Sequence, residues 1–169
     1  HRGRSSPQHR TRLGHLMART CGSCTLCCTV QGIKEGMPGT PNGEKLPNVP
    51  CPYAKVHAPS CGGCSIYETR PSECSGYVCL WIEGLGGAAD RPDKTGVLFE
   101  VHDQEDPAHP FVAARTLRRG LEKNPRVQAI ITHLRGKGIR TVVVYPEDVQ
   151  GWDAVINLDE GVAPVRPRE

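Results

Sequence analysis

The sequence predicts an α+β protein in two parts: an irregular cysteine-rich half, followed by a small sheet with a covering helix. All nine cysteines lie between Cys21 and Cys79, in a stretch rich in glycine and proline that has no sustained apolar period. Further along, short apolar runs alternate with one stretch of helical periodicity, the pattern of a sheet covered by a helix. We therefore expect a cysteine-rich module over residues 17–90 and a small α+β region packed on it over residues 91–162.

The two ends of the chain are expected to lie outside this fold. Residues 1–16 are basic and polar, and we interpret them as a disordered leader or a segment foreign to the natural chain, with Met17 as the natural start. A disordered native arm is the competing interpretation. Residues 163–169 are expected to form a disordered tail.

No stretch approaches the roughly 20 apolar residues that span a membrane, and no apolar core of a signal peptide follows the basic start. We therefore expect a cytoplasmic protein with no membrane partner. The formal net charge is +3, but residues 1–16 hold four arginines and no acid. The rest of the chain is close to neutral, which argues against a nucleic-acid partner.

The cysteine-rich half lacks the apolar side chains for an ordinary core, and small modules of this kind are held by disulfides or metal. The absence of an export signal indicates a reducing compartment, where thiols stay reduced. Nine is also an odd number, and the adjacent Cys27 and Cys28 are awkward for disulfides. These observations favour metal ions held by thiolates.

The spacing of the cysteines supports this interpretation. Cys21, Cys24 and Cys27 recur at intervals of three and are followed directly by Cys28, and a second Cys-x-x-Cys pair ends at Cys64. A Cys-x-x-Cys loop folds back so that both sulfurs face one point, as a metal with sulfur bonds near ~2.3 Å requires. Two such pairs with five further cysteines are strong evidence for a metal site.

The number and kind of metal stay open at this point. Because Cys27 and Cys28 are adjacent, their side chains point in different directions, so one can complete a site with Cys21 and Cys24 while the other faces a second site. Eight thiolates make two four-coordinate sites, and a cluster with bridging sulfurs is equally open. The spacing of Cys21, Cys24 and Cys27, followed by Cys51-Pro52, is partly similar to the cysteine motif of bacterial ferredoxins. The similarity is incomplete because Cys51-Pro52 lies far downstream. All-thiolate sites suit both an iron–sulfur cluster and Zn²⁺.

The pattern of the whole region resembles the bacterial CxxCxxCC cysteine-cluster family (YkgJ type). The likeness rests on the opening run, on Cys64 followed by Ile66-Tyr67 and Arg70-Pro71, and on a closing Cys-Leu-Trp, and it covers about two-fifths of the chain. That family is regarded as a zinc- or iron-chelating domain. The resemblance implies these ligands: Cys21, Cys24, Cys27, Cys28, Cys51, Cys64, Cys74 and Cys79.

The sequence departs from this family at three places. Ser75 and Tyr77 stand where the family often has arginine and phenylalanine, and Cys61 has no counterpart. Cys61 is therefore set apart from the eight implied ligands. His57 lies between Cys51 and Cys61 and could replace a thiolate as a ligand, but we favour the interpretation that it is an exposed loop residue. The remaining histidines of the second half are expected to be structural or exposed: His102, His109 and His133.

Arg70 has two interpretations. Its guanidinium can face the negative charge of the thiolates, or it can form a salt bridge with Glu68 or Glu73. A short helical turn is expected before Pro71, because proline disfavours helix in the residue before it. The aromatic side chains of this region are expected to pack around the metal as a dry shell: Tyr67, Tyr77 and Trp81.

The second half contains ordinary secondary-structure signals. Strands are predicted over 96–102, 111–117, 141–145 and 154–158. Pro125 opens a helix whose apolar residues recur at three- and four-residue spacing, and Gly136 and Gly138 end it. No phosphate-binding glycine loop, nucleophile elbow or Ser-His-Asp order is present.

Three functions follow from these patterns. The first is a metal-handling or structural metal-binding module, and the second is a redox protein that carries an iron–sulfur cluster for electron transfer. The third is a zinc-ribbon-like module for protein or nucleic-acid interaction. The expected partners are metal ions and a protein redox or metal-transfer partner. We expect no hydrolytic or transferase activity; an enzymatic role would be that of an iron–sulfur oxidoreductase component.

Overall fold

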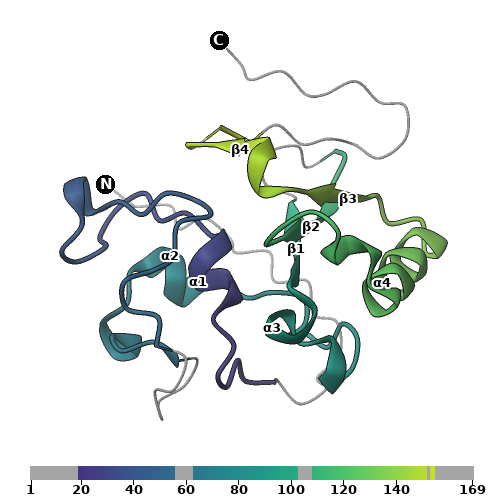
Figure 1. The fold of residues 1–169 in the computed structure, drawn as a ribbon, viewed down its shortest axis with the longest axis horizontal. Coiled ribbons are helices and arrows are strands. Elements are labelled where there is room, and N and C mark those ends of the chain that lie inside the picture. The colour runs from purple at the N-terminus through teal and green to yellow at the C-terminus, as the bar shows by residue number, and fades with distance from the viewer. Residues whose placement is uncertain (1–18, 56–62, 103–107, 152, 155–169) are drawn as a thin grey trace, which may run out of the picture.

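The computed structural model of the chain describes residues 19–55, 63–102, 108–151, 153 and 154. Short helices pack with a small three-stranded mixed sheet, so the predicted α+β class is confirmed (Figure 1). The expected leader and tail lie outside the described residues. None of the helices in the described parts is long and apolar enough to cross a membrane.

The regular structure of the cysteine-rich half consists mainly of short helices. In chain order they are α1 (Leu26–Val30), η1 (Pro41–Gly43), η3 (Tyr67–Thr69), α2 (Ser72–Gly76), η4 (Ala88–Asp90) and α3 (Pro92–Thr95), where η marks a 3₁₀ helix. The turn predicted before Pro71 is η3. The other described residues of this half form loops, turns and isolated β-bridges, in agreement with its irregular sequence.

The second half contains the sheet and its covering helix. Its elements are β1 (Val97–His102), β2 (Phe111–Thr116), η5 (Leu121–Lys123), α4 (Pro125–Gly136), β3 (Thr141–Val144), η6 (Pro146–Asp148), β4 (Val149–Gln150) and β5 (Asp153–Ala154). The three predicted strands of the main sheet and the helix are confirmed to within a residue. Of the strand predicted over 154–158, only its first residue is described, in β5.

The sheet has the order β1-β2-β3. β1 and β2 are antiparallel, with Phe99 opposite Ala114, whereas β2 and β3 are parallel, with Val112 opposite Thr141. A parallel pair needs a crossover connection, and α4 provides it. The helix begins with Pro125 in its first turn, and the side chain of Asn124 accepts a hydrogen bond from the backbone N–H of Arg126.

The two faces of β1 serve different cores, because successive side chains of a strand alternate between faces. Val97 and Phe99 pack with the apolar stripe of α4. Leu98 points the other way and packs with Cys24, Leu26 and other residues around α1. The cysteine-rich half therefore lies on the sheet face opposite α4 (Figure 1).

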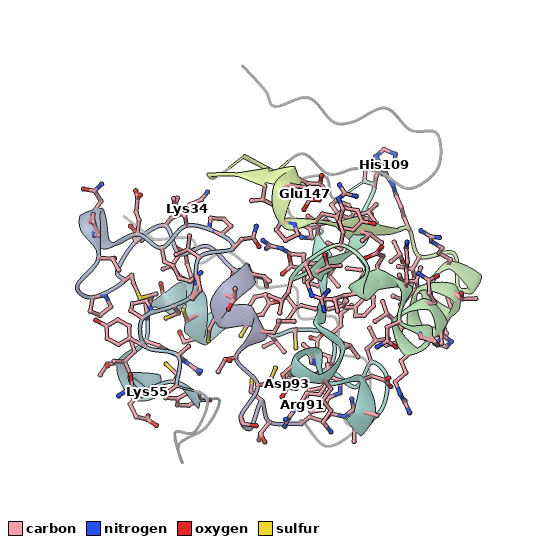
Figure 2. All side chains as sticks on the ribbon, in the orientation of Figure 1. Lys34, Lys55, Arg91, Asp93, His109 and Glu147 are labelled. Atoms are coloured by element: carbon pink, nitrogen blue, oxygen red, sulfur yellow. The ribbon has the colours of Figure 1, made fainter. Side chains whose placement is uncertain are left out.

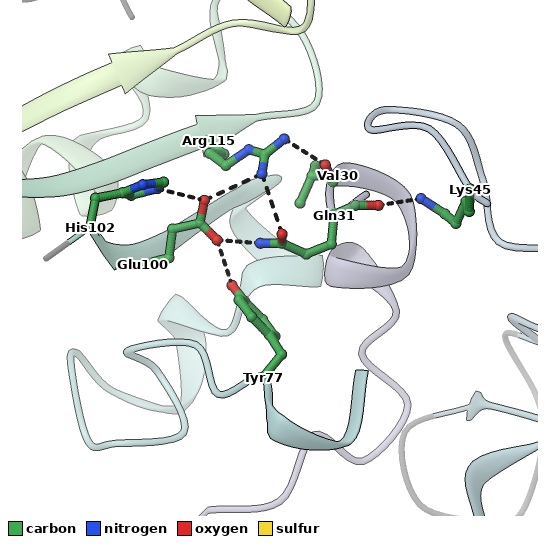
Figure 3. Close-up of polar contacts among 7 residues, drawn as sticks. All are labelled: Val30, Gln31, Lys45, Tyr77, Glu100, His102 and Arg115. Carbon is green, nitrogen blue, oxygen red and sulfur yellow. Dashed lines mark hydrogen bonds and ion pairs between the residues drawn. The ribbon is translucent and has the colours of Figure 1, made fainter. Parts of the chain in front are cut away.

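A buried carboxylate follows Leu98 on this face. Glu100 accepts hydrogen bonds from the Tyr77 hydroxyl at 3.0 Å, His102 Nε2 at 3.1 Å and Arg115 Nη1 at 3.3 Å, and a further one from the Gln31 amide (Figure 3). Burial alone would raise the pKa of Glu100. The hydrogen bond from His102 and the charges of Arg115 and His102 outweigh burial, so the pKa lies below its ordinary value. Glu100 is therefore ionised.

Arg115 extends this network to the end of α1. Its Nη2 donates to the carbonyl oxygen of Val30 at 2.6 Å, and its Nη1 lies 3.5 Å from Gln31 Oε1. The last carbonyls of a helix have no partner within the helix. Arg115 thus joins β2 to the segment that directly follows Cys27 and Cys28.

We expect Arg115→Met to lower the free energy of unfolding by about 3 kcal/mol or more, because it leaves the carboxylate of Glu100 buried without its main counter-charge. Arg126→Met is the matched control: Arg126 pairs with Asp90 at 3.3 Å, but its side chain is 58% exposed. Loss of that pair should cost less than about 1 kcal/mol. Urea denaturation of both variants measures the difference, and equal losses would contradict a central role for Glu100.

Candidate metal centre

The first Cys-x-x-Cys loop is a tight turn. The backbone N–H of Cys24 donates to the carbonyl oxygen of Cys21 at 3.0 Å, and Gly22 has φ +56°, a left-handed conformation that glycine adopts without steric cost. Arg91 fixes the loop from outside, since its Nη2 donates to Ser23 Oγ at 3.2 Å. Figure 2 shows Arg91 beside its salt-bridge partner Asp93.

Cys27 and Cys28 lie in α1. Adjacent residues of a helix point about 100° apart, so the two sulfurs face different surroundings. The carbonyl oxygen of Cys28 accepts a hydrogen bond from the backbone N–H of Cys51 at 3.0 Å. This bond places the Cys51 loop beside the helix.

An isolated antiparallel bridge pairs Ala54 with Cys64 and so brings Cys64 to the same place. Gly63 directly precedes it with φ +62°, and a Cβ there would lie 2.6 Å from the carbonyl oxygen of Lys55. Only glycine fits this position. Cys74 reaches the site from α2.

These segments enclose a cavity of about 470 Å³ next to α1. Seven of the cysteines line it: Cys21, Cys24, Cys27, Cys28, Cys51, Cys64 and Cys74. Cys79 is buried in the adjoining apolar cluster, where it packs with Cys24. None of these eight cysteines is in a disulfide. Figure 2 shows the sulfur atoms gathered around α1 and α2.

Electrostatic contacts divide the eight thiols into two groups of four. The inner group is Cys21, Cys24, Cys27 and Cys79, and the outer group is Cys28, Cys51, Cys64 and Cys74. Within the inner group Cys21 interacts with Cys79, and Cys27 with Cys21 and Cys24. Within the outer group Cys74 interacts with each of the other three. The two groups meet at Cys28, which accepts a hydrogen bond from Cys27 and also interacts with Cys21.

The two groups differ in part in their exposure to solvent. In the inner group Cys24 and Cys79 are buried against Leu26 and Leu98, whereas Cys21, Cys27 and all four outer cysteines are partly exposed. Tyr77 and Trp81 pack against the inner group, as the sequence predicted for a dry shell. The remaining aromatic residue of the prediction, Tyr67, lines the cavity.

Most of these thiols hold their protons when no metal is bound. Burial raises the pKa of Cys24 and of Cys74 from 9.0 to about 11. The hydrogen bond between the two adjacent cysteines, followed by burial, raises the pKa of Cys27. The same hydrogen bond lowers the pKa of Cys28, with help from the ammonium of Lys45. The adjacent Cys27 and Cys28 are therefore not both ionised. Only an added cation would allow all the thiols to ionise.

The donor set fits a thiophilic metal, because the thiols of the seven cysteines that line the cavity are ligands that zinc and iron–sulfur clusters take. Among the residues that the structure describes, however, no three His, Cys, Asp or Glu side chains converge closely enough to hold an ion. Bringing four sulfurs to one point would require changes of χ1, which moves Sγ between staggered positions.

Arg70 lies over the Tyr67 ring, 3.8 Å from its centroid, and its charge opposes the effect of burial on the pKa of Cys21 and Cys74. Glu73 instead accepts a hydrogen bond from the backbone N–H of Lys34. The first of the two interpretations of Arg70, that it faces the thiols, is therefore favoured over a salt bridge.

Other predicted residues lie elsewhere. His102 pairs with Glu100 and stacks on Phe111, with ring centroids 4.9 Å apart, which is a structural role. His109 and His133 are exposed. Cys61 and His57 lie within residues 56–62, outside the described part of the chain. The sequence analysis missed Lys45, which lines the cavity and carries no motif that would single it out.

No family model, curated protein or solved structure matches this chain.

We expect the metal-free protein to lose stability as the pH rises from about 9 to about 11. In this range the unfolded chain releases thiol protons near their ordinary pKa of about 8.5–9, while folded Cys24 and Cys74 keep theirs up to about 11. The folded state then binds more protons than the unfolded state, so its stability falls with pH. Urea midpoints measured with chelator and reductant test this, and Cys74→Ser should show a shallower fall. A flat profile would contradict the burial of protonated thiols.

Proposed function

We propose that this chain is a metal-binding protein that holds an iron–sulfur cluster or Zn²⁺ through its cysteine cluster. The observation that carries the proposal is the gathering of seven cysteines around one cavity, with an eighth, Cys79, buried in the apolar cluster beside it. Ordinary cysteines are spread through a core as small apolar residues. The resemblance of the spacing to the CxxCxxCC family supports the same function.

Two groups of four thiols match the needs of two four-coordinate sites. In this assignment the inner group holds one metal and the outer group the other, and the adjacent Cys27 and Cys28 separate them. Four thiolates per metal would leave no position for a substrate, so the proposal does not include hydrolysis or group transfer. An iron–sulfur cluster would supply electron exchange, and zinc would supply cross-linking of the fold.

The two groups support different roles for the two sites. Burial of Cys24 and Cys79 in an apolar cluster is typical of a site that holds the fold together. The partial exposure of the outer group suits electron transfer or the handing over of metal to a protein partner. We place this activity in the cytoplasm, where thiols stay reduced. The second candidate, a zinc-ribbon-like interaction module, is favoured only by the closed character of the inner group.

Anaerobically purified protein should contain at least one tightly bound zinc or iron per chain, because buried thiolates bind these metals strongly. Elemental analysis and an absorption spectrum measure this together. A colourless zinc protein supports the structural or metal-handling role, and iron with an absorption band in the visible range supports the redox role. A folded protein without metal would refute the proposal.

We expect Cys64→Ser to release metal that the wild-type protein retains against a chelator, because Cys64 belongs to the outer group. Cys61→Ser is the matched control from the same Cys-x-x-Cys pair and should retain more, since Cys61 has no counterpart in the family pattern. Equal losses from the two variants would show that the assignment of ligands to the outer group is wrong.

A further inference from the structure

Lys45 is a buried cation without a carboxylate partner among the described residues. It is only 5% exposed, and its Nζ donates to the carbonyl oxygens of Thr29 and Leu46 at 3.2 Å and to that of Gln31 (Figure 3). Carbonyl groups solvate an ammonium ion but do not neutralise it. Since buried charges in proteins are normally paired or bound to metal sites, Lys45 needs an explanation.

Lys45 lines the same cavity as the four cysteines of the outer group. A backbone bridge to Ile33, with both N–O distances 2.8 Å, holds Lys45 against the end of α1. Burial lowers the pKa of Lys45, and negative charge on Cys51, Cys28 and Cys74 acts in the opposite direction. The charges that favour the ammonium form thus come from three of the four outer cysteines.

Arg115 provides the comparison. It reaches the same end of α1 from the sheet, but its charge is balanced by Glu100. Arg115 and Lys45 repel each other, which adds to the cost of the second cation. Of these two cations at one helix end, only Arg115 has a carboxylate partner among the described residues. The negative groups that act on Lys45 are cysteines that line the same cavity.

We infer that Lys45 is the counter-ion of a metal held by the outer cysteine group, and that this site carries net negative charge when loaded. The inference rests on the proposed function. A divalent ion with four thiolates keeps two negative charges, and an iron–sulfur cluster held by four thiolates is also anionic. A fixed positive charge beside such a site strengthens metal binding, and it favours the reduced form of a cluster.

A purely structural role for Lys45 makes a different prediction. If its only task is to bind the last carbonyls of α1, replacing it should weaken the metal-free and metal-loaded proteins equally. Metal affinity would then be unchanged. If Lys45 is a counter-ion, its removal has opposite effects on the stability of the two forms. The metal-free protein is stabilised, because it loses a buried charge that has no carboxylate partner. The metal-loaded protein is destabilised, because it loses the attraction between Lys45 and the anionic site.

The experiment compares Lys45→Met with the wild-type protein and with Lys123→Met, an exposed lysine of η5, as the matched control. Each protein is loaded with Zn²⁺ alone under reducing conditions and competed with a chelator of known zinc affinity. Melting temperatures are recorded with and without zinc. Lys45→Arg restores the charge, and Lys45→Gln keeps a donor for the carbonyls if the methionine variant does not fold.

We expect Lys45→Met, or Lys45→Gln, to weaken zinc binding about 10- to 100-fold, the effect of one partly buried charge at a separation of a few ångströms. The metal-free variant should melt at or above the wild-type temperature, Lys45→Arg should recover most of the affinity, and Lys123→Met should change neither quantity. Wild-type affinity in the uncharged variants, or failure of both to fold without metal, would overturn the counter-ion role. Absence of zinc binding by the wild-type protein would instead refute the proposed function.

Discussion

The carboxylate of Glu100 connects the two halves of the molecule. It lies on the sheet face that α1 covers, and it accepts hydrogen bonds from Gln31 and Tyr77 on the cysteine-rich side and from His102 and Arg115 on the sheet side. The five residues of α1 are too few to form a stable helix alone. Their position, and with it that of Cys27 and Cys28, depends on a sheet formed much later in the chain.

The cysteines around the cavity differ in whether apolar side chains or cations lie near them. Cys24 and Cys79 lie in apolar surroundings, whereas the cation of Lys45 acts on outer cysteines such as Cys28, and that of Arg70 acts on cysteines of both groups. Thiols in the first environment favour their neutral form, and those in the second are closer to cations that favour thiolates. One helix thus presents adjacent cysteines to two sites of different polarity, and that difference is the basis for assigning them different roles.

The elements that the sequence predicts well are those whose signal is local. The apolar run of β1 and the helical period of α4 show which residues must be buried, so their bounds are accurate. α1 and α2 contain too few residues for a period to appear. The partition of the cysteines depends on contacts such as that between Cys28 and Cys51, which no local pattern encodes. The charged residue within the apolar run of β1, Glu100, was the one available sign of a buried network.

The alternation along β1 limits how this architecture can be recombined. Val97 and Phe99 serve the α4 core, and Leu98 and Glu100 serve the cysteine-rich half. A shift of one residue in the register of this strand would move each set to the opposite face of the sheet. The carboxylate of Glu100 would then point into the apolar core under α4. The cysteine motif alone therefore cannot be transferred to another protein. Such a transfer would have to include β1 and Arg115 of β2, paired in this register.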